Sequence, residues 1–206
     1  KSNLGPLPFG RYSTPYANCR CCPFNHKFPE CKWACIDYIK KKIRYETTND
    51  IAAIIVEPIQ GTAGNVVPPE GFLIELKKLA EEIGALLIAD EMITGFGRTG
   101  KMFGCQHDGV IPDIITIGKG FGGGFPMTGL MSRDEVIFSK PFANPSGSSS
   151  SYGGNPIAST GALAALQIII EEGLVENSRV VGEYMLKRFN ELKEKYTVIG
   201  EVRGKG

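Results

Sequence analysis

The fold of this chain is most constrained by three short runs of apolar, largely β-branched residues that each stop abruptly. They are "IAAIIVEP" at 51–58, "ALLIADE" at 85–91 and "DIITIG" at 113–118. Runs that are apolar throughout, rather than alternating with polar residues, are typical of strands covered on both faces. Because helical patterns intervene between several such runs, the sequence predicts an α/β domain with a mostly parallel sheet between helices.

Helical and further extended segments follow from the same periodicity. The segment 72–84, "FLIELKKLAEEIG", carries an apolar stripe and ends at a glycine suited to a helix C-cap. The stripe consists of Phe72, Leu76, Leu79, Ala80 and Ile83. Residues 127–132 predict another strand, and two helices are predicted at about 156–172 and about 176–195. A short helix is expected from "CIDYIKKKI" at 35–43.

Composition excludes several classes of protein. Of 206 residues, 42% are hydrophobic and 22% charged, which is typical of a folded, soluble domain. A net charge of +1 offers no basic surface for nucleic acid or anionic membrane, and no apolar run approaches the roughly 20 residues of a membrane helix. We therefore expect a cytoplasmic protein. The chain starts without methionine and stops at "EVRGKG", so we also expect a piece of a longer protein.

Five of the six cysteines fall in one short stretch, "CRCCPFNHKFPECKWAC", which also contains His26. They are Cys19, Cys21, Cys22, Cys31 and Cys35. A zinc or iron–sulfur site is one reading, but the paired CxxC knuckles typical of such sites are absent. Reduced, partly buried cysteines in an irregular loop are favoured, so no metal is predicted.

Polar residues close three of the predicted strands, where an ordinary loop would not require them. Glu57, Asp90 and Lys119 stand at these ends, and the glycine-rich stretch "GKGFGGGFP" prevents the last strand from continuing. Each residue alone is ordinary as a cap or a solvated charge. Because the carboxyl ends of parallel strands share one edge, the three together predict a site in a cleft there.

An aspartate and a lysine at adjacent strand ends fit the needs of pyridoxal phosphate. The lysine amine forms a Schiff base with the aldehyde, and a buried aspartate pairs with the protonated pyridine nitrogen. The hydroxyl-rich stretch "SSSSYGGNP", which leads into a predicted helix, suits a phosphate group. Flexible low-complexity sequence is the alternative interpretation of that stretch.

Four ordered motifs carry a resemblance to a known family. "VEPIQGTAGNVVPPEGFL", "LLIADEMITGFGRTGKMFG", "DIITIGKGFGGGFPMTGLM" and "SYGGNPIASTGALAAL" resemble the class III aminotransferases, of ω-amino acid or 4-aminobutyrate aminotransferase type, among the fold type I pyridoxal-phosphate enzymes. The resemblance covers about 50–206, and "PYANCRCCPFNHKFPEC" is similar to the arm before it in some members. It implies a fold type I large domain that is incomplete at both ends.

The resemblance also implies a division of the chain into three parts. Residues 1–50 would form a Cys/Pro-rich arm and a short helix, and 51–175 the core that binds pyridoxal phosphate. Residues 176–206 would supply a helix and a strand that lead toward a missing C-terminal small domain.

Individual roles follow from the motif positions. The resemblance implies that Lys119 is the catalytic Schiff-base lysine and Asp90 the partner of the pyridine nitrogen. Met92 falls where a small apolar residue, usually valine, packs on one ring face, and Glu57 matches the glutamate that supports the cofactor cleft. Ser151 occupies the position of a phosphate-binding threonine that reaches the neighbouring subunit's cofactor. The resemblance therefore implies a homodimer.

The implied reaction moves an amino group from an amine or ω-amino acid, such as 4-aminobutyrate, to a 2-oxo acid. Two departures weaken a strict 4-aminobutyrate assignment: Thr62 replaces a glutamate that pairs with a substrate-site arginine, and Ile93 replaces a glutamine near the cofactor's ring hydroxyl. A decarboxylase, racemase or aminomutase would share Asp90 and Lys119.

In two alternative interpretations, this chain does not itself catalyse a reaction. A nucleotide-binding module is disfavoured because "GKGFGGG" lacks both the P-loop and the dinucleotide fingerprint. A non-catalytic fragment of an aminotransferase stays open, since in the family one phosphate-binding loop precedes this segment and a substrate-carboxylate arginine follows it.

Overall fold

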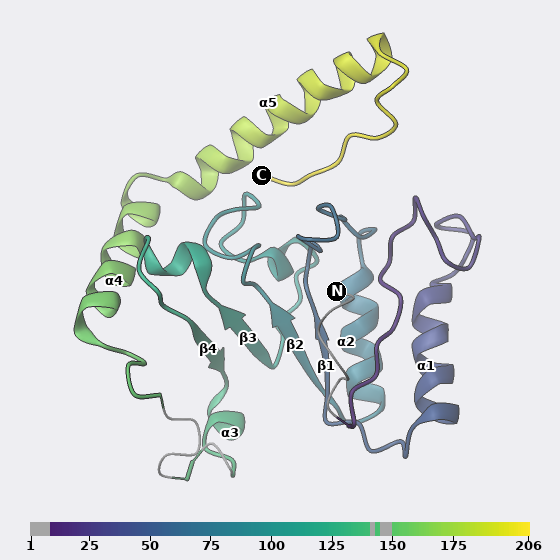
Figure 1. Cartoon of the computed structure of the whole chain (residues 1–206). Coiled ribbons are helices and arrows are strands. Elements are labelled where there is room, and N and C mark those ends of the chain that lie inside the picture. Colours follow the sequence, from purple (N-terminus) through teal and green to yellow (C-terminus); the bar gives the residue numbers. More distant parts are fainter. Residues whose placement is uncertain (1–8, 141–142, 145–149) are drawn as a thin grey trace.

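A four-stranded sheet lies at the centre of the molecule (Figure 1). The computed structural model describes residues 9–140, 143–144 and 150–206. In spatial order the strands are β1 (Ala53–Val56), β2 (Leu86–Asp90), β3 (Ile114–Ile117) and β4 (Gly129–Ser132). The helices and turns are α1 (Ala34–Glu46), α2 (Phe72–Glu82), η1 (Gly104–His107), η2 (Lys119–Gly122), α3 (Asp134–Ile137), α4 (Pro156–Glu171) and α5 (Leu174–Lys195). The predicted α/β class is confirmed.

The sheet is mostly parallel, as predicted, with one antiparallel edge. β1 pairs in parallel with β2, and β2 with β3. β4 runs antiparallel to β3, with Ile117 opposite Gly129. A parallel return needs a crossover of about a dozen residues or more, usually through a helix. The segment 118–128 between these strands contains only the short turn η2, so the chain reverses instead.

The apolar stripe of α2 forms the centre of the core. Phe72, Leu76 and Leu79 are almost fully buried, and the same helix face contacts β1 and β2. Gly84 ends the helix in a left-handed conformation (φ +69°), and the Ala85 N–H donates to the Ala80 carbonyl at 2.8 Å. This closure returns the chain directly into β2, as the C-capping glycine predicts.

The N-terminal arm is held to the core through Tyr16. Its hydroxyl donates to the Glu57 and Pro58 carbonyls, each at 3.0 Å, and its ring packs edge-on against Phe72. Burial, reinforced by the nearby Glu57 carboxylate, raises the pKa of the Tyr16 hydroxyl. The arm therefore braces the segment that leaves β1.

The predicted cysteine cluster consists of free thiols. Cys19, Cys22, Cys31 and Cys35 line one small cavity together with His26. No three Cys, His, Asp or Glu side chains in the described part of the chain are arranged to hold a metal ion. Burial, followed by the neighbouring Cys31, raises the pKa of the Cys19 thiol.

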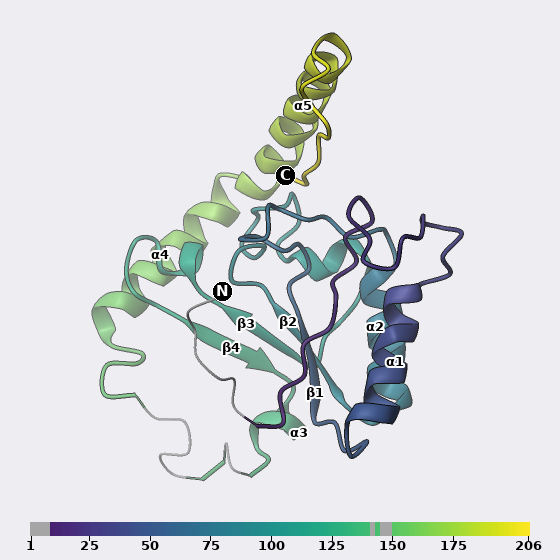
Figure 2. The same ribbon diagram turned by 45° about the vertical axis from the view of Figure 1, so that its right-hand side comes forward.

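The C-terminal helices leave the sheet at an angle. Asn155 caps α4 by accepting a hydrogen bond from the Ala158 N–H at 3.0 Å, and Gly173 separates α4 from α5. The two helices are bent by 63°, and α5 projects away from the sheet in both views (Figure 2). None of the described helices is long and apolar enough to cross a membrane by itself; the bent α4–α5 pair passes that test by length and composition only.

The strand predicted after α5 does not form. Residues 196–206 contain no strand and run back from the end of α5 toward the sheet (Figure 1). A strand needs a hydrogen-bonding neighbour, and the described sheet ends at β1 and β4. The tail is instead held through side chains, chiefly that of Arg203.

Candidate active site

The carboxyl ends of the three parallel strands meet at one edge of the sheet, as the sequence predicts. The β1–β2 ladder ends at Val56, and the β2–β3 ladder ends at Asp90. Glu57 follows β1 at this level, and Lys119 opens the turn η2 just after β3. The structure therefore brings the strand-end residues Glu57, Asp90 and Lys119 to the same edge.

Asp90 is half-buried and held through one of its two carboxylate oxygens. Its Oδ1 accepts hydrogen bonds from the Met92 N–H at 3.1 Å and from the Thr116 hydroxyl at 3.3 Å. Its Oδ2 has no hydrogen-bond partner among the described residues. A fixed carboxylate with one unused oxygen is suited to pair with a cationic N–H group.

Lys119 presents an exposed amine from a strained backbone position. Its φ of +49° lies in the left-handed region, which costs a residue with a side chain about 1–2 kcal/mol. Its ammonium group forms no ion pair with any side chain that the structure describes. Strain of this kind is concentrated at functional positions, and an unpaired amine is available for covalent chemistry.

The side chain of Met92, two residues after Asp90, contacts Gly118, the residue before Lys119. A Cβ atom added to Gly118 would lie 2.4 Å from the Met92 Cε and 2.8 Å from its sulfur, so the end of the Met92 side chain lies against the Gly118 backbone. The contact therefore joins the segments that follow β2 and β3.

Glu57 holds the loop that follows β1. Its Oε2 accepts a hydrogen bond from the Gly61 N–H at 2.9 Å, and Gln60 and Val66 form a bridge across the loop. A Cβ atom added to Gly61 would lie 2.2 Å from the Ile93 Cδ1. Glu57 thus holds the start of this loop, which packs against Ile93, the residue after Met92.

The sequence matches the family described as Aminotransferase class-III over residues 1–206. The chain belongs to this family. A leucine/methionine racemase from Thermococcus litoralis is 45% identical over 193 residues, which are 93% of this chain and 43% of the racemase.

Solved structures of similar proteins share the fold. An amine transaminase from an uncultivated Pseudomonas species, solved in its PLP-bound form, matches 99% of this chain with a TM-score of 0.89 and 35% identity. An (S)-enantioselective ω-transaminase from Thermomicrobium roseum matches 100% of it with a TM-score of 0.88 and 36% identity. The chain covers 47% and 46% of these two proteins, so it spans less than half the length of its relatives.

Ser151 is not brought to the edge that carries Lys119. It is exposed in the loop that leads into α4 and makes no hydrogen bond to another described residue. Figure 1 shows the stretch that enters α4 outside β4, at the end of α4 that lies away from α5. Of the serine-rich stretch, residues 145–149 lie outside the described residues, so phosphate binding there stays a prediction.

Glu91 is a site residue that the sequence analysis missed. It is fully buried (0% exposed), and its carboxylate accepts hydrogen bonds from the Thr94 hydroxyl and from the Gly104 and Cys105 N–H groups, the last two at 2.8 Å. Burial and the Glu91 charge raise the pKa of the Cys105 thiol to about 12. The only signal in the sequence is a second acidic residue directly after Asp90. Because successive side chains at the end of a strand point to opposite faces, that of Glu91 points into the core.

The residues at this edge fit the ring end of pyridoxal phosphate. The Asp90 Oδ2 is unused, the Lys119 amine is unpaired, and the side chain of Met92 fills the space that a Cβ at Gly118 would need. The polar, cationic and apolar groups that such a cofactor requires therefore lie at one edge of the sheet. Ser151 of the same chain is not among the residues at this edge.

Proposed function

We propose that this chain is the cofactor-binding part of a pyridoxal-phosphate-dependent aminotransferase. The observation that carries the proposal is the parallel pairing of β2 with β3, in which Asp90 lies opposite Thr116, three residues before Lys119. Family membership and the PLP-bound amine transaminase relative support the same cofactor.

Each residue has a defined task in this proposal. When bound, the cofactor supplies an aldehyde that condenses with amines and a ring that withdraws electrons from the reacting carbon. The Lys119 Nζ would hold the cofactor and would take up and return the proton of the amino donor. The Asp90 carboxylate keeps the ring nitrogen protonated, and Met92 contacts the ring face.

The proposed reaction transfers an amino group from an amine or ω-amino acid to a 2-oxo acid. Relatives named amine transaminase, ω-transaminase and, from Plasmodium yoelii, ornithine aminotransferase support an amino donor of this class. Thr62 and Ile93 argue against 4-aminobutyrate as the specific donor. The remote position of Ser151 supports a homodimer, in which that residue would serve the partner's cofactor.

A racemase is the second candidate function. It is favoured by the 45% identity to the leucine/methionine racemase of Thermococcus litoralis. Racemisation and transamination both begin with removal of a proton from the carbon that bears the amine, so Asp90 and Lys119 serve either reaction. The two differ in where the proton is returned.

Product analysis separates these candidates. The intact protein, supplied with pyridoxal phosphate, would be incubated with a panel of amines, ω-amino acids and L-leucine, with and without a 2-oxo acid. Transfer of the amine to the 2-oxo acid supports the aminotransferase. Appearance of D-leucine without any 2-oxo acid would replace that proposal with the racemase.

Replacing Lys119 tests the proposed catalytic amine. Because general acid–base catalysis contributes about 10²–10⁴-fold, we expect Lys119→Ala to lower kcat by at least that factor. Lys101→Ala, which removes another exposed lysine, is the matched control and should leave kcat unchanged. Turnover by the Lys119→Ala protein at the wild-type rate would refute the assignment.

A further inference from the structure

The loop from Gly61 to Val66 lies beside the proposed site, because Gly61 packs against Ile93, the residue after Met92. Glu57 holds the first residue of the loop. The loop also carries Thr62, at the position where the family resemblance places a residue near the substrate. The Gly64 and Asn65 N–H groups both donate to the Gly61 carbonyl at 3.0 Å, which gives the loop its compact shape.

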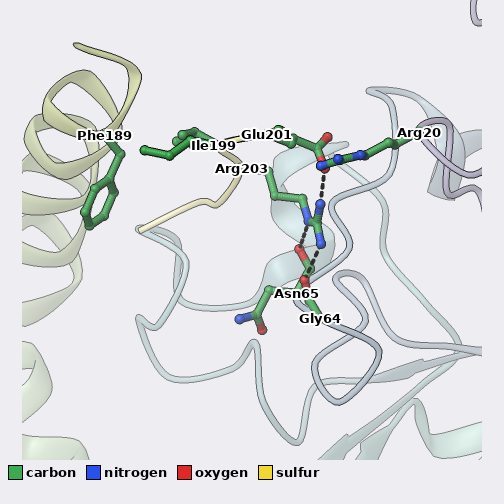
Figure 3. A pocket seen from close by; sticks show the side chains of 9 residues that line it. Arg20, Gly64, Asn65, Phe189, Ile199, Glu201 and Arg203 are labelled. Carbon is green, nitrogen blue, oxygen red and sulfur yellow. Dashed lines mark hydrogen bonds and ion pairs between the residues drawn. The ribbon is translucent and has the colours of Figure 1, made fainter. Parts of the chain in front are cut away.

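Arg203 fastens the outer side of this loop. Its Nε donates to the Asn65 carbonyl at 3.1 Å, and its Nη2 donates to the Gly64 carbonyl at 2.7 Å (Figure 3). The remaining nitrogen, Nη1, pairs with the Glu201 carboxylate. All three guanidinium nitrogens are therefore engaged, and Arg203 has no free fork with which to bind a substrate carboxylate.

Glu201 links this arrangement to the N-terminal arm. Its Oε2 also pairs with the Arg20 Nη1 at 3.3 Å, and the two arginines flank it beside a cavity of about 520 Å³. Figure 3 shows Arg20 beside Glu201, with the Arg203 guanidinium between Glu201 and the loop residues Gly64 and Asn65. The N-terminal arm and the C-terminal tail thus meet at a cavity that Gly64 and Asn65 of the loop also line.

We propose that Arg203 is a positioning residue that holds the loop 61–66 in the shape required to seat the amino donor. The inference rests on the proposed function, which supplies both the site and the amino donor. Arg203 binds two carbonyls near the end of the loop, and Glu57 binds the Gly61 N–H at its start. Thr62 therefore lies between two points at which the loop is held. Lysine cannot replace this fork, because its single nitrogen cannot reach both carbonyls and Glu201 in a planar arrangement.

The test compares Arg203→Lys and Arg203→Met in the intact protein with Arg188→Lys as the matched control. Arg188 is an exposed arginine of α5 that pairs only with Glu191 among the described side chains. We expect both Arg203 variants to speed hydrogen–deuterium exchange in the loop peptide at least fivefold and to raise KM for the amino donor at least fivefold. We expect kcat and the cofactor's absorption spectrum to change less than twofold.

A variant of Glu201 also tests the positioning role of Arg203. Glu201→Gln removes the ion pairs but leaves both carbonyl contacts, so its effect should be smaller than that of Arg203→Lys; this variant keeps the test open if Arg203→Met fails to fold. Unchanged exchange and unchanged KM in Arg203→Lys would overturn the positioning role. If the wild-type protein binds no pyridoxal phosphate, the proposed function fails, whereas the exchange result still reports on the loop.

Discussion

Asp90 and Glu91 are adjacent carboxylates with different tasks. Successive residues at the end of a strand point to opposite sides, so Asp90 faces the site while Glu91 enters the core. Glu91 is fully buried and satisfied by three donors, two of them backbone N–H groups of η1. It therefore anchors the glycine-rich segment 92–104 beneath the residues that contact the cofactor in our proposal.

Glu91→Gln tests this anchoring. The amide offers one acceptor oxygen and places an NH2 group against a donor, which leaves a buried group unsatisfied at a cost of about 1–3 kcal/mol. We expect a decrease of this size in the free energy of unfolding, measured by urea denaturation, and weaker retention of pyridoxal phosphate. Glu135→Gln, on an exposed side chain, is the control. Equal stability of the two variants would contradict the anchoring role.

At the scale of elements, Asp113 joins the sheet to α2. Its side chain is 7% exposed and accepts hydrogen bonds from the Leu87 N–H at 2.8 Å and from the Lys77 Nζ at 2.9 Å. Arg133, after β4, pairs with its other oxygen at 3.2 Å. Although burial would raise the pKa of Asp113, these hydrogen bonds and cations lower it below its usual value.

The lowered pKa of Asp113 predicts a specific acid dependence. The stabilisation is fully present above the unfolded value of about 3.8 and is lost as the pH falls through the lower folded value. Asp113→Asn should cost about 1.5–3 kcal/mol at pH 7 and should flatten the loss of stability below pH 4. Thermal unfolding at several pH values, with Asp50→Asn as control, measures both effects. An unchanged acid profile would show that Asp113 does not contribute.

Periodicity predicts which elements form, but not every pairing between them. The stripe of α2 and its closing glycine were sufficient to predict that helix within two residues of its end. β4 runs antiparallel to β3 because the connection 118–128 contains only a short turn and no crossover helix. Hydrophobic periodicity does not indicate the direction of a strand. The tail after α5 has an apolar, strand-like composition, yet a strand also needs a neighbour that local sequence cannot supply.

At the scale of the whole molecule, the sequence predicts those site residues that stand at the ends of parallel strands. Glu57, Asp90 and Lys119 were identifiable because parallel strands deliver their carboxyl ends to one edge. Arg203 was not, because its partners Gly64 and Asn65 lie more than a hundred residues earlier and leave no periodic signal. The homodimer, the role of Ser151, the cytoplasmic location and the three-part division of the chain stay predictions.

The most direct test of the central claim is to locate the lysine that carries the cofactor. The intact protein would be treated with pyridoxal phosphate, reduced with borohydride and digested, and the modified peptide would be identified by mass spectrometry. Our account predicts one pyridoxyl group, on Lys119, and loss of the visible absorption band in Lys119→Ala. Modification of a different lysine, such as Lys101, or of none, would contradict it.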